Sequence, residues 1–65
     1  MDKVTCDNLG GDTIVSIISN ETTVSPWQLI EDSGFISLVK CHIKKCTELS
    51  DAISSLTDYV NNNYW

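Results

Sequence analysis

Arginine is missing from this chain of 65 residues, and only four lysines oppose nine aspartates and glutamates. The formal net charge at pH 7 is therefore −5. Proteins that bind a nucleic-acid backbone normally use several Lys or Arg contacts to phosphate, so this composition argues against that role. An acidic surface keeps a protein in solution and also suits docking onto a basic partner.

Long hydrophobic runs are missing as well. No stretch approaches the roughly 18 apolar residues of a transmembrane helix, and residues 1–5 (MDKVT) lack the basic and then apolar segments of a secretory signal. We therefore expect a cytoplasmic protein without a membrane partner. Cys6, Cys41 and Cys46 have no disulfide-framework spacing, so we expect them to be reduced, with Cys6 and Cys41 buried as small apolar residues.

Motifs for catalysis and metal binding are also absent from the sequence. The chain has a single histidine, His42, and contains neither G-x-S-x-G, nor H-E-x-x-H, nor a phosphate-binding glycine loop. The spacing Cys41-x4-Cys46 matches neither a zinc ribbon nor a C-x-x-C redox pair. We therefore predict a non-enzymatic protein with no cofactor and no metal ion.

The segment Phe35–Lys45 (FISLVKCHIKK) has an alternating pattern that is typical of a strand. Its odd-numbered residues form a largely apolar face, which we predict to be the core side. Its even-numbered residues form a second face, apolar at the start and cationic at the end. The members of that face are Ile36, Leu38, Lys40, His42 and Lys44.

The segment Leu49–Val60 carries apolar residues at i, i+3, i+4, i+7, i+10 and i+11, which is the stripe of an amphipathic helix. Thr47 or Ser50 is the predicted N-cap, and residues 61–63 (NNN) are the predicted end. The strand and the helix each have one apolar face, so we expect them to pack against each other.

Three further strands are predicted at residues 3–7, Thr13–Ser19 and Trp27–Glu31. The glycine-containing segments at residues 8–12 and 32–34 are predicted to be hairpin turns, with Gly34 in the left-handed conformation. The predicted fold class is α+β, with one domain spanning residues 1–65. It consists of a four-stranded antiparallel sheet made of two hairpins, with one C-terminal helix packed on one face.

One helix covers only one face of such a sheet, so the other face would leave an apolar patch in water. We interpret this patch as an interface, either for a partner protein or for a homodimer through the helix-free sheet face. The cationic row would supply polar contacts, and the terminal tryptophan an aromatic anchor. The predicted partner-binding residues are Trp27, Ile36, Leu38, Lys40, His42, Lys44 and Trp65.

The predicted strand running into residues 47–53 (TELSDAI) resembles small acidic proteins encoded by bacteriophages and other mobile elements. Several of those proteins bind and block host enzymes, among them RNA polymerase inhibitors and anti-CRISPR proteins. The resemblance implies that the chain binds a host protein or protein–nucleic acid complex in the host cytoplasm. On this hypothesis it inhibits or sequesters its partner.

Two alternative functions follow from the distribution of charge. Three of the four lysines lie within Lys40–Lys45, and this ridge suits a nucleic-acid or phosphate-ligand binding module. The other alternative is an acidic nucleic-acid mimic whose carboxylates imitate the spacing of phosphates. The residues assigned to that role are Asp2, Asp7, Asp12, Glu48, Asp51 and Asp58.

Overall fold

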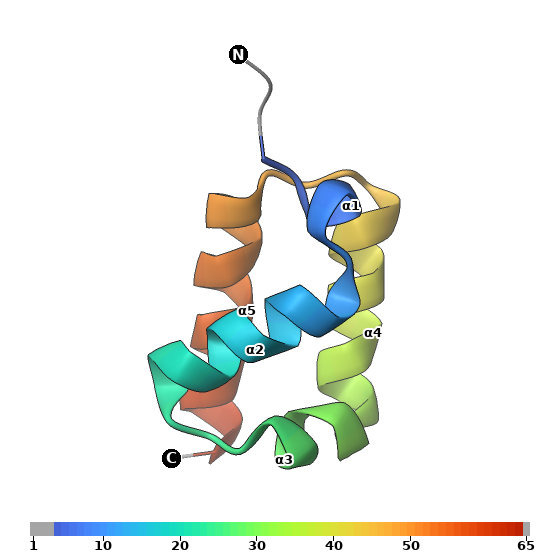
Figure 1. The fold of residues 1–65 in the computed structure, drawn as a ribbon. Coiled ribbons are helices and arrows are strands. Elements are labelled where there is room, and N and C mark those ends of the chain that lie inside the picture. Colours follow the sequence, from blue (N-terminus) through green and yellow to red (C-terminus); the bar gives the residue numbers. More distant parts are fainter. Residues whose placement is uncertain (1–3, 65) are drawn as a thin grey trace.

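The computed structural model describes residues 4–64, which form five α-helices. These are α1 (Cys6–Leu9), α2 (Gly11–Thr22), α3 (Pro26–Glu31), α4 (Ser33–Lys44) and α5 (Leu49–Tyr64) (Figure 1). Within this part of the chain, the sole β-type pairing is an isolated antiparallel bridge between Thr5 and Glu48. The predicted α+β fold with a four-stranded sheet is therefore wrong, and so is the helix-free sheet face proposed for a homodimer.

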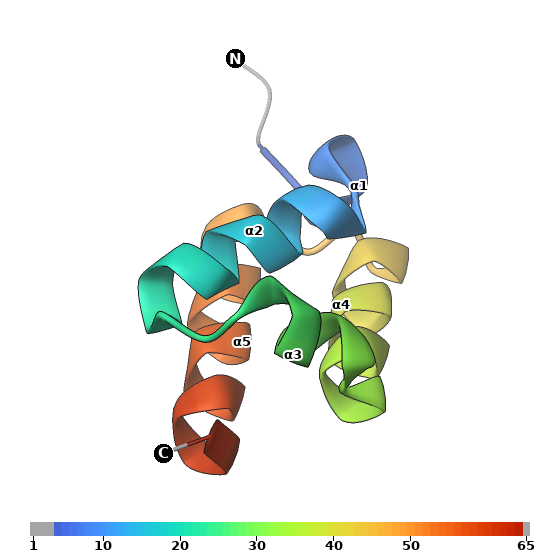
Figure 2. The same ribbon diagram turned by 60° about the horizontal axis from the view of Figure 1, so that its bottom comes forward.

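The two long C-terminal helices, α4 and α5, run antiparallel to each other (Figure 1). α2 crosses both of them, and α1 packs against α2 and α4 near the N-terminal end of the bundle. α3 lies at the opposite end, between α2 and α4, and the turned view in Figure 2 shows it below the crossing helix. The predicted contact between segment 35–45 and the C-terminal helix exists, as a packing of two helices.

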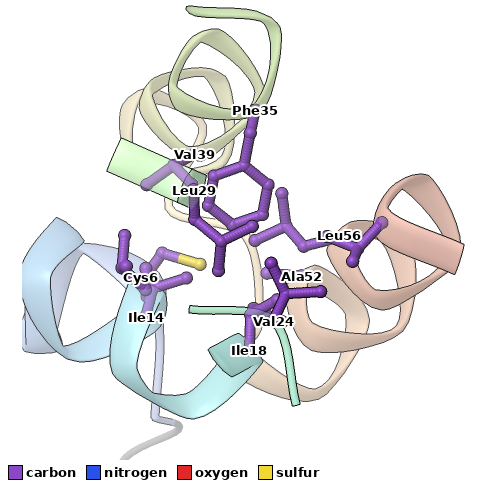
Figure 3. Packing of buried hydrophobic residues seen from close by; sticks show 11 residues of the cluster. Cys6, Ile14, Ile18, Val24, Leu29, Phe35, Val39, Ala52 and Leu56 are labelled. Carbon is purple, nitrogen blue, oxygen red and sulfur yellow. The ribbon is translucent and has the colours of Figure 1, made fainter. Parts of the chain in front are cut away.

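The core draws apolar side chains from all five helices, and they converge between α2, α4 and α5 (Figure 3). Fully burying an aliphatic or aromatic side chain contributes roughly 1.5–3 kcal/mol. A chain of this size therefore depends on nearly all of them. The buried apolar residues are Cys6, Ile14, Val15, Ile18, Val24, Leu29, Phe35, Val39, Ala52, Leu56 and Val60.

Segment Phe35–Lys45, predicted as a strand, is almost entirely helical in α4. Phe35 and Val39 are buried, and this spacing of four residues fits a helix as well as a strand. A strand would also bury Ser37 and Cys41, whereas the structure exposes both. The prediction that Cys41 is buried is therefore wrong, while the burial of Cys6 is confirmed.

Segment Thr13–Ser19, predicted as a strand, lies within α2. Ile14, Ile18 and Thr22 are buried at successive intervals of four residues, so one face of the helix meets the core. The Thr22 hydroxyl donates a hydrogen bond to the Ile18 carbonyl at 2.7 Å and is thereby satisfied inside the protein. Thr23 ends the helix with a φ of 61°, in the left-handed region.

Segment Trp27–Glu31, predicted as a strand, belongs to α3, which has Pro26 in its first turn, where proline is favoured. The predicted hairpin turn at residues 32–34 is instead a helix start. The Asp32 carboxylate accepts from the backbone N–H groups of Gly34 and Phe35, at 2.9 and 3.2 Å, and caps α4. Gly34 does not have the predicted positive φ; Gly10, between α1 and α2, has a φ of 82°.

The C-terminal helix is confirmed, and it is longer than predicted because residues 61–63 lie inside α5. Neither Thr47 nor Ser50 occupies the N-cap position, because the first helical hydrogen bond runs from Ala52 N to the Glu48 carbonyl at 3.0 Å. The strand predicted at residues 3–7 is not present in the described residues of that segment, since Cys6 and Asp7 open α1. No helix in residues 4–64 combines the length and apolarity needed to cross a membrane.

Candidate partner-binding site

Helix α3 exposes two large apolar side chains. Trp27 keeps 72% of its surface in water and Ile30 keeps 50%. They lie three residues apart and therefore share a side of the helix, while Leu29 is fully buried on another side. A tryptophan exposed to this degree, next to a second exposed aliphatic residue, is typical of an interaction surface.

A small groove lies beside Ile30, where α3 meets the first turn of α2 and the middle of α4. We call it, together with Trp27, the Trp27 groove. Its volume is about 220 Å3. Its lining residues are Gly11, Asp12, Val15, Ile30, Ile36, Val39 and Lys40.

The chemistry of the Trp27 groove is apolar with two charges. Val15 and Val39 are buried residues of the core, while Asp12 and Lys40 are exposed and bring one charge of each sign to the groove. Pockets for small molecules typically measure about 300–1,000 Å3, so this groove is too small for that use. Its size and apolar lining suit a single apolar side chain.

Helical geometry brings only some of the predicted site residues together. Ile36 and Lys40, four residues apart on α4, both line the Trp27 groove. Leu38 and His42 lie on the opposite flank of α4, because residues two positions apart on a helix point about 200° apart. Both are half-buried rather than exposed. The even-numbered face of the predicted strand is therefore split between two sides of the helix.

The lysine ridge, predicted on a strand, lies on and just after helix α4. Lys40 and Lys44 are exposed one turn apart on α4, and Lys45 follows at the end of the helix. Within residues 4–64, none of these three lysines takes part in an ion pair. Lys44 does not line the Trp27 groove. Trp65, the predicted aromatic anchor, lies outside the described residues.

The predicted site omitted Asp12, Val15 and Ile30. The pairing of Ile30 with Trp27 depends on a spacing of three residues, and this places them on one side only if residues 26–31 are helical. Asp12 and Val15 come from α2, far from α4 in the sequence, so only the tertiary fold brings them to the groove. The Ser25–Pro26 pair was the available signal, since it is typical of a helix start.

A second polar constellation, the Asp32 cluster, consists of Asp32, Tyr59 and Tyr64. The Tyr64 hydroxyl donates to Asp32 Oδ2 at 2.8 Å, and the Tyr59 hydroxyl lies 3.2 Å from both carboxylate oxygens. These bonds tie the C-terminal half of α5 to the junction of α3 and α4. The ring of Tyr59 also packs on Phe35, with centroids 6.2 Å apart.

The electrostatics of the Asp32 cluster argue against catalysis. Partial burial and the hydrogen bond to the Asp32 carboxylate raise the pKa of Tyr64 to about 12, so its hydroxyl stays protonated near neutrality. Burial pushes the pKa of Asp32 up, but the hydrogen bonds from Tyr64, Phe35 N, Tyr59 and Gly34 N outweigh it, and the net pKa is lowered. A weaker acid and a weaker base than usual make poor proton-transfer groups at pH 7. The cluster is a structural tie.

No metal centre is visible in the described part of the chain, where no three His, Cys, Asp or Glu side chains gather to hold an ion. Cys41 and Cys46 are exposed free thiols, while Cys6 is a buried one whose pKa is raised by desolvation. A raised pKa leaves a thiol protonated and unreactive. The acidic residues assigned to nucleic-acid mimicry are spread over α1, α2, α5 and the residue before α5, apart from Asp2, which lies outside the described residues.

Comparison with protein-family models, with curated proteins and with solved structures found no match to this chain. The resemblance to phage-encoded proteins relied in part on a strand ending at Lys45, and that segment is helix α4. What remains of the pattern is the small size, the acidity and the helix that begins at Leu49.

Proposed function

We propose that this chain is a non-enzymatic protein that binds another protein through the Trp27 groove and thereby inhibits or sequesters it. The observation that carries the proposal is the 72% exposure of Trp27, three residues before Ile30, which lines an apolar groove sized for one side chain. The acidity of the chain and the resemblance of residues 47–53 to phage-encoded proteins support a host protein, or a host protein–nucleic acid complex, in the cytoplasm as the partner.

The groove and the tryptophan make different contacts with the partner. An apolar side chain of the partner enters the space between Ile30, Ile36 and Val39, while the partner surface covers the Trp27 ring. Buried aromatic residues commonly dominate the free energy of protein interfaces. Asp12 and Lys40 are placed to pair with charges on the partner, which fixes its orientation more than its affinity.

The binding hypothesis is tested with the double variant Trp27→Ser/Ile30→Ser in pull-downs from a bacterial host lysate. The matched control is Leu9→Ser, which removes another exposed apolar side chain, 36% exposed, from α1. We expect the wild type and the control to retain the same partner, and the double variant to lose it. Circular dichroism should show that all three chains are folded. Equal retention by the double variant would contradict the proposal.

Self-association is the competing use of the same surface. Light scattering over a range of concentrations should show a monomer for the wild type if the occupant is a different protein. A dimer that dissociates in the Trp27→Ser/Ile30→Ser variant would replace the proposed partner with a second copy. In the variant Trp65→Phe, Trp27 is the single tryptophan, and its fluorescence should shift to the blue when the retained partner binds.

The lysine ridge supports a second candidate, a nucleic-acid or phosphate-ligand binding module. The observation that favours it is the exposure of Lys40 and Lys44 on one side of α4 without an ion pair in residues 4–64. Nucleic acid retained in the same pull-downs should then be lost in Lys40→Ala/Lys44→Ala and should fall steeply with salt. Retention that is insensitive to salt and to this variant would rule it out.

A further inference from the structure

A second groove lies where the C-terminal half of α2 meets the start of α5 and the segment before α1. We call it the Glu21 groove. Its volume is about 550 Å3, which is more than twice that of the Trp27 groove. Its lining residues are Val4, Ile17, Glu21, Glu48, Leu49, Ser50 and Ile53.

Backbone hydrogen bonds hold one wall of the Glu21 groove in place. Leu49 N donates to the Val4 carbonyl at 3.0 Å, and Cys6 N donates to the Thr47 carbonyl at 3.0 Å. These bonds pin the segment before α1 alongside the start of α5. Val4 is consequently held at the groove with 51% of its surface in water. An aliphatic side chain held exposed by its backbone is available for contact with a ligand.

The charge of the Glu21 groove has one sign. Among residues 4–64, its ionisable lining residues are Glu21 and Glu48, both exposed, and its other lining residues are uncharged. Glu21 lies in the last turn of α2, where no basic residue accompanies it. The carboxyl end of a helix carries partial negative charge, so a glutamate there is unfavourable for the free protein. A cation placed at this position would relieve that repulsion.

We propose that the Glu21 groove binds a basic amphipathic segment of a partner polypeptide. Aliphatic side chains of the segment lie on Val4, Ile17 and Ile53, and its Lys or Arg side chains reach the carboxylates of Glu21 and Glu48. The groove volume falls within the range of about 300–1,000 Å3 that is typical of ligand sites, so it accommodates more than one side chain. This surface shares no lining residue with the Trp27 groove.

The test is a fluorescence-anisotropy titration of the full chain with a labelled helical peptide of about four turns, made of Leu and Lys in an amphipathic pattern. The variant Glu21→Gln/Glu48→Gln removes both carboxylates of the groove. The matched control, Asp7→Asn/Asp58→Asn, changes the net charge by the same amount at exposed positions elsewhere. We expect the Kd to rise about tenfold in the groove variant, which corresponds to two surface ion pairs, and to change little in the control. Equal weakening in both variants would overturn the proposal, because it would show attraction to net charge alone.

Two further arms test the chemistry of the groove and the role of Glu21. A peptide of Leu and Glu, and a peptide of Lys without Leu, should both bind weakly, since the site requires apolar and cationic groups together. Glu21→Lys should raise the Tm of the free chain, by relieving the end of α2, and yet weaken peptide binding. A variant that lost both stability and binding would instead indicate a structural role for Glu21 and would count against the site.

The proposal is independent of the Trp27 groove. The Trp27→Ser/Ile30→Ser variant should bind the Leu-Lys peptide with unchanged Kd. If that variant loses the peptide while Glu21→Gln/Glu48→Gln keeps it, the peptide occupies the Trp27 groove and the inference is wrong. Failure of the Glu21 groove would leave the function proposed for Trp27 standing.

Discussion

The two ends of helix α5 are anchored in different ways. At its C-terminal end, Tyr59 and Tyr64 tie the helix to Asp32 through side-chain hydrogen bonds. At its N-terminal end, the bonds to the segment before α1 are backbone bonds, such as Leu49 N to the Val4 carbonyl, and the Glu21 groove remains beside them. Side-chain ties depend on particular residues, whereas backbone ties do not. The N-terminal end can therefore change its surface residues without losing its anchor.

The side-chain tie at the C-terminal end of α5 also explains how the short helix α3 can hold an exposed tryptophan in place. α3 has six residues and buries only Leu29, which is little for a helix to hold its place. The Asp32 cluster supplies additional anchoring, because Asp32 follows α3 directly and Tyr64 reaches it from α5. Trp27 thus projects from a short helix whose end is fixed, so binding has to order its side chain but not the helix that carries it.

The largest expected contrast between the two ends is in packing. Phe35→Ala removes a fully buried ring beside Tyr59 and should lower the free energy of unfolding by about 3–5 kcal/mol. Ile53→Ala, at the half-buried wall of the Glu21 groove, should lower it by about 1 kcal/mol, since part of that side chain already faces water. Urea denaturation of both variants measures the two losses. Equal losses would mean that the N-terminal end is packed as tightly as the other.

The sequence predicted α5 well because its pattern fits one period only. Leu56 and Val60 are buried four residues apart, and a strand with both on its core face would also have to bury the charged Asp58 between them. Segment 35–45 was ambiguous, since Phe35 and Val39 satisfy both periods. The residues that discriminate are Ser37 and Cys41, which a strand would bury and which the helix exposes. Cys41 is small enough to lie in a core, so the polar Ser37 was the one local argument against a strand.

The β-branched run in segment 13–19 misled the prediction for another reason. Its strand propensity is real, but propensity is worth little compared with tertiary burial. Ile14, Val15 and Ile18 are all buried, and a strand covered on one face would leave Val15 or its neighbours in water. Of the candidate site, the sequence predicted Trp27, Ile36 and Lys40. The contribution of α2 depends on a helix crossing that local patterns do not encode.

A smaller, pH-dependent effect on stability is expected at the C-terminal end of α5, where Tyr64 bonds to Asp32. The pKa of Tyr64 is raised from 10.0 to about 12 by burial and by its bond to Asp32, so the folded state holds its proton more tightly than the unfolded state does. The resulting stability is present below pH 10 and is lost as the pH rises through about 12. Thermal unfolding should therefore show the Tm advantage of the wild type over Tyr64→Phe shrinking across that window. A difference that stays constant with pH would show that Tyr64 does not bond to Asp32.

The smallest expected effect concerns Gly34, in the first turn of α4. A Cβ at this position would lie 2.6 Å from the Tyr59 hydroxyl oxygen, so Gly34→Ala must displace that hydroxyl from Asp32. Alanine is nevertheless favoured over glycine in a helix by roughly 0.5–1 kcal/mol. In the wild-type background, the gain in helix propensity and the loss of the Tyr59–Asp32 hydrogen bond oppose each other. The net change in the free energy of unfolding should therefore be small.

The variant Tyr59→Phe separates these two contributions to the Gly34→Ala effect. It removes the hydroxyl and leaves Cζ as the nearest ring atom, at an ordinary contact distance of 3.6 Å. In this background Gly34→Ala should stabilise the chain by less than the helix-propensity gain of roughly 0.5–1 kcal/mol, because Asp32 Oδ1 still lies only 3.3 Å from the added Cβ. Urea denaturation of the four chains of this double-mutant cycle gives the coupling. Identical effects of Gly34→Ala in the two backgrounds would show that Tyr59 does not approach Gly34, and the tied end would then rest on Tyr64 alone.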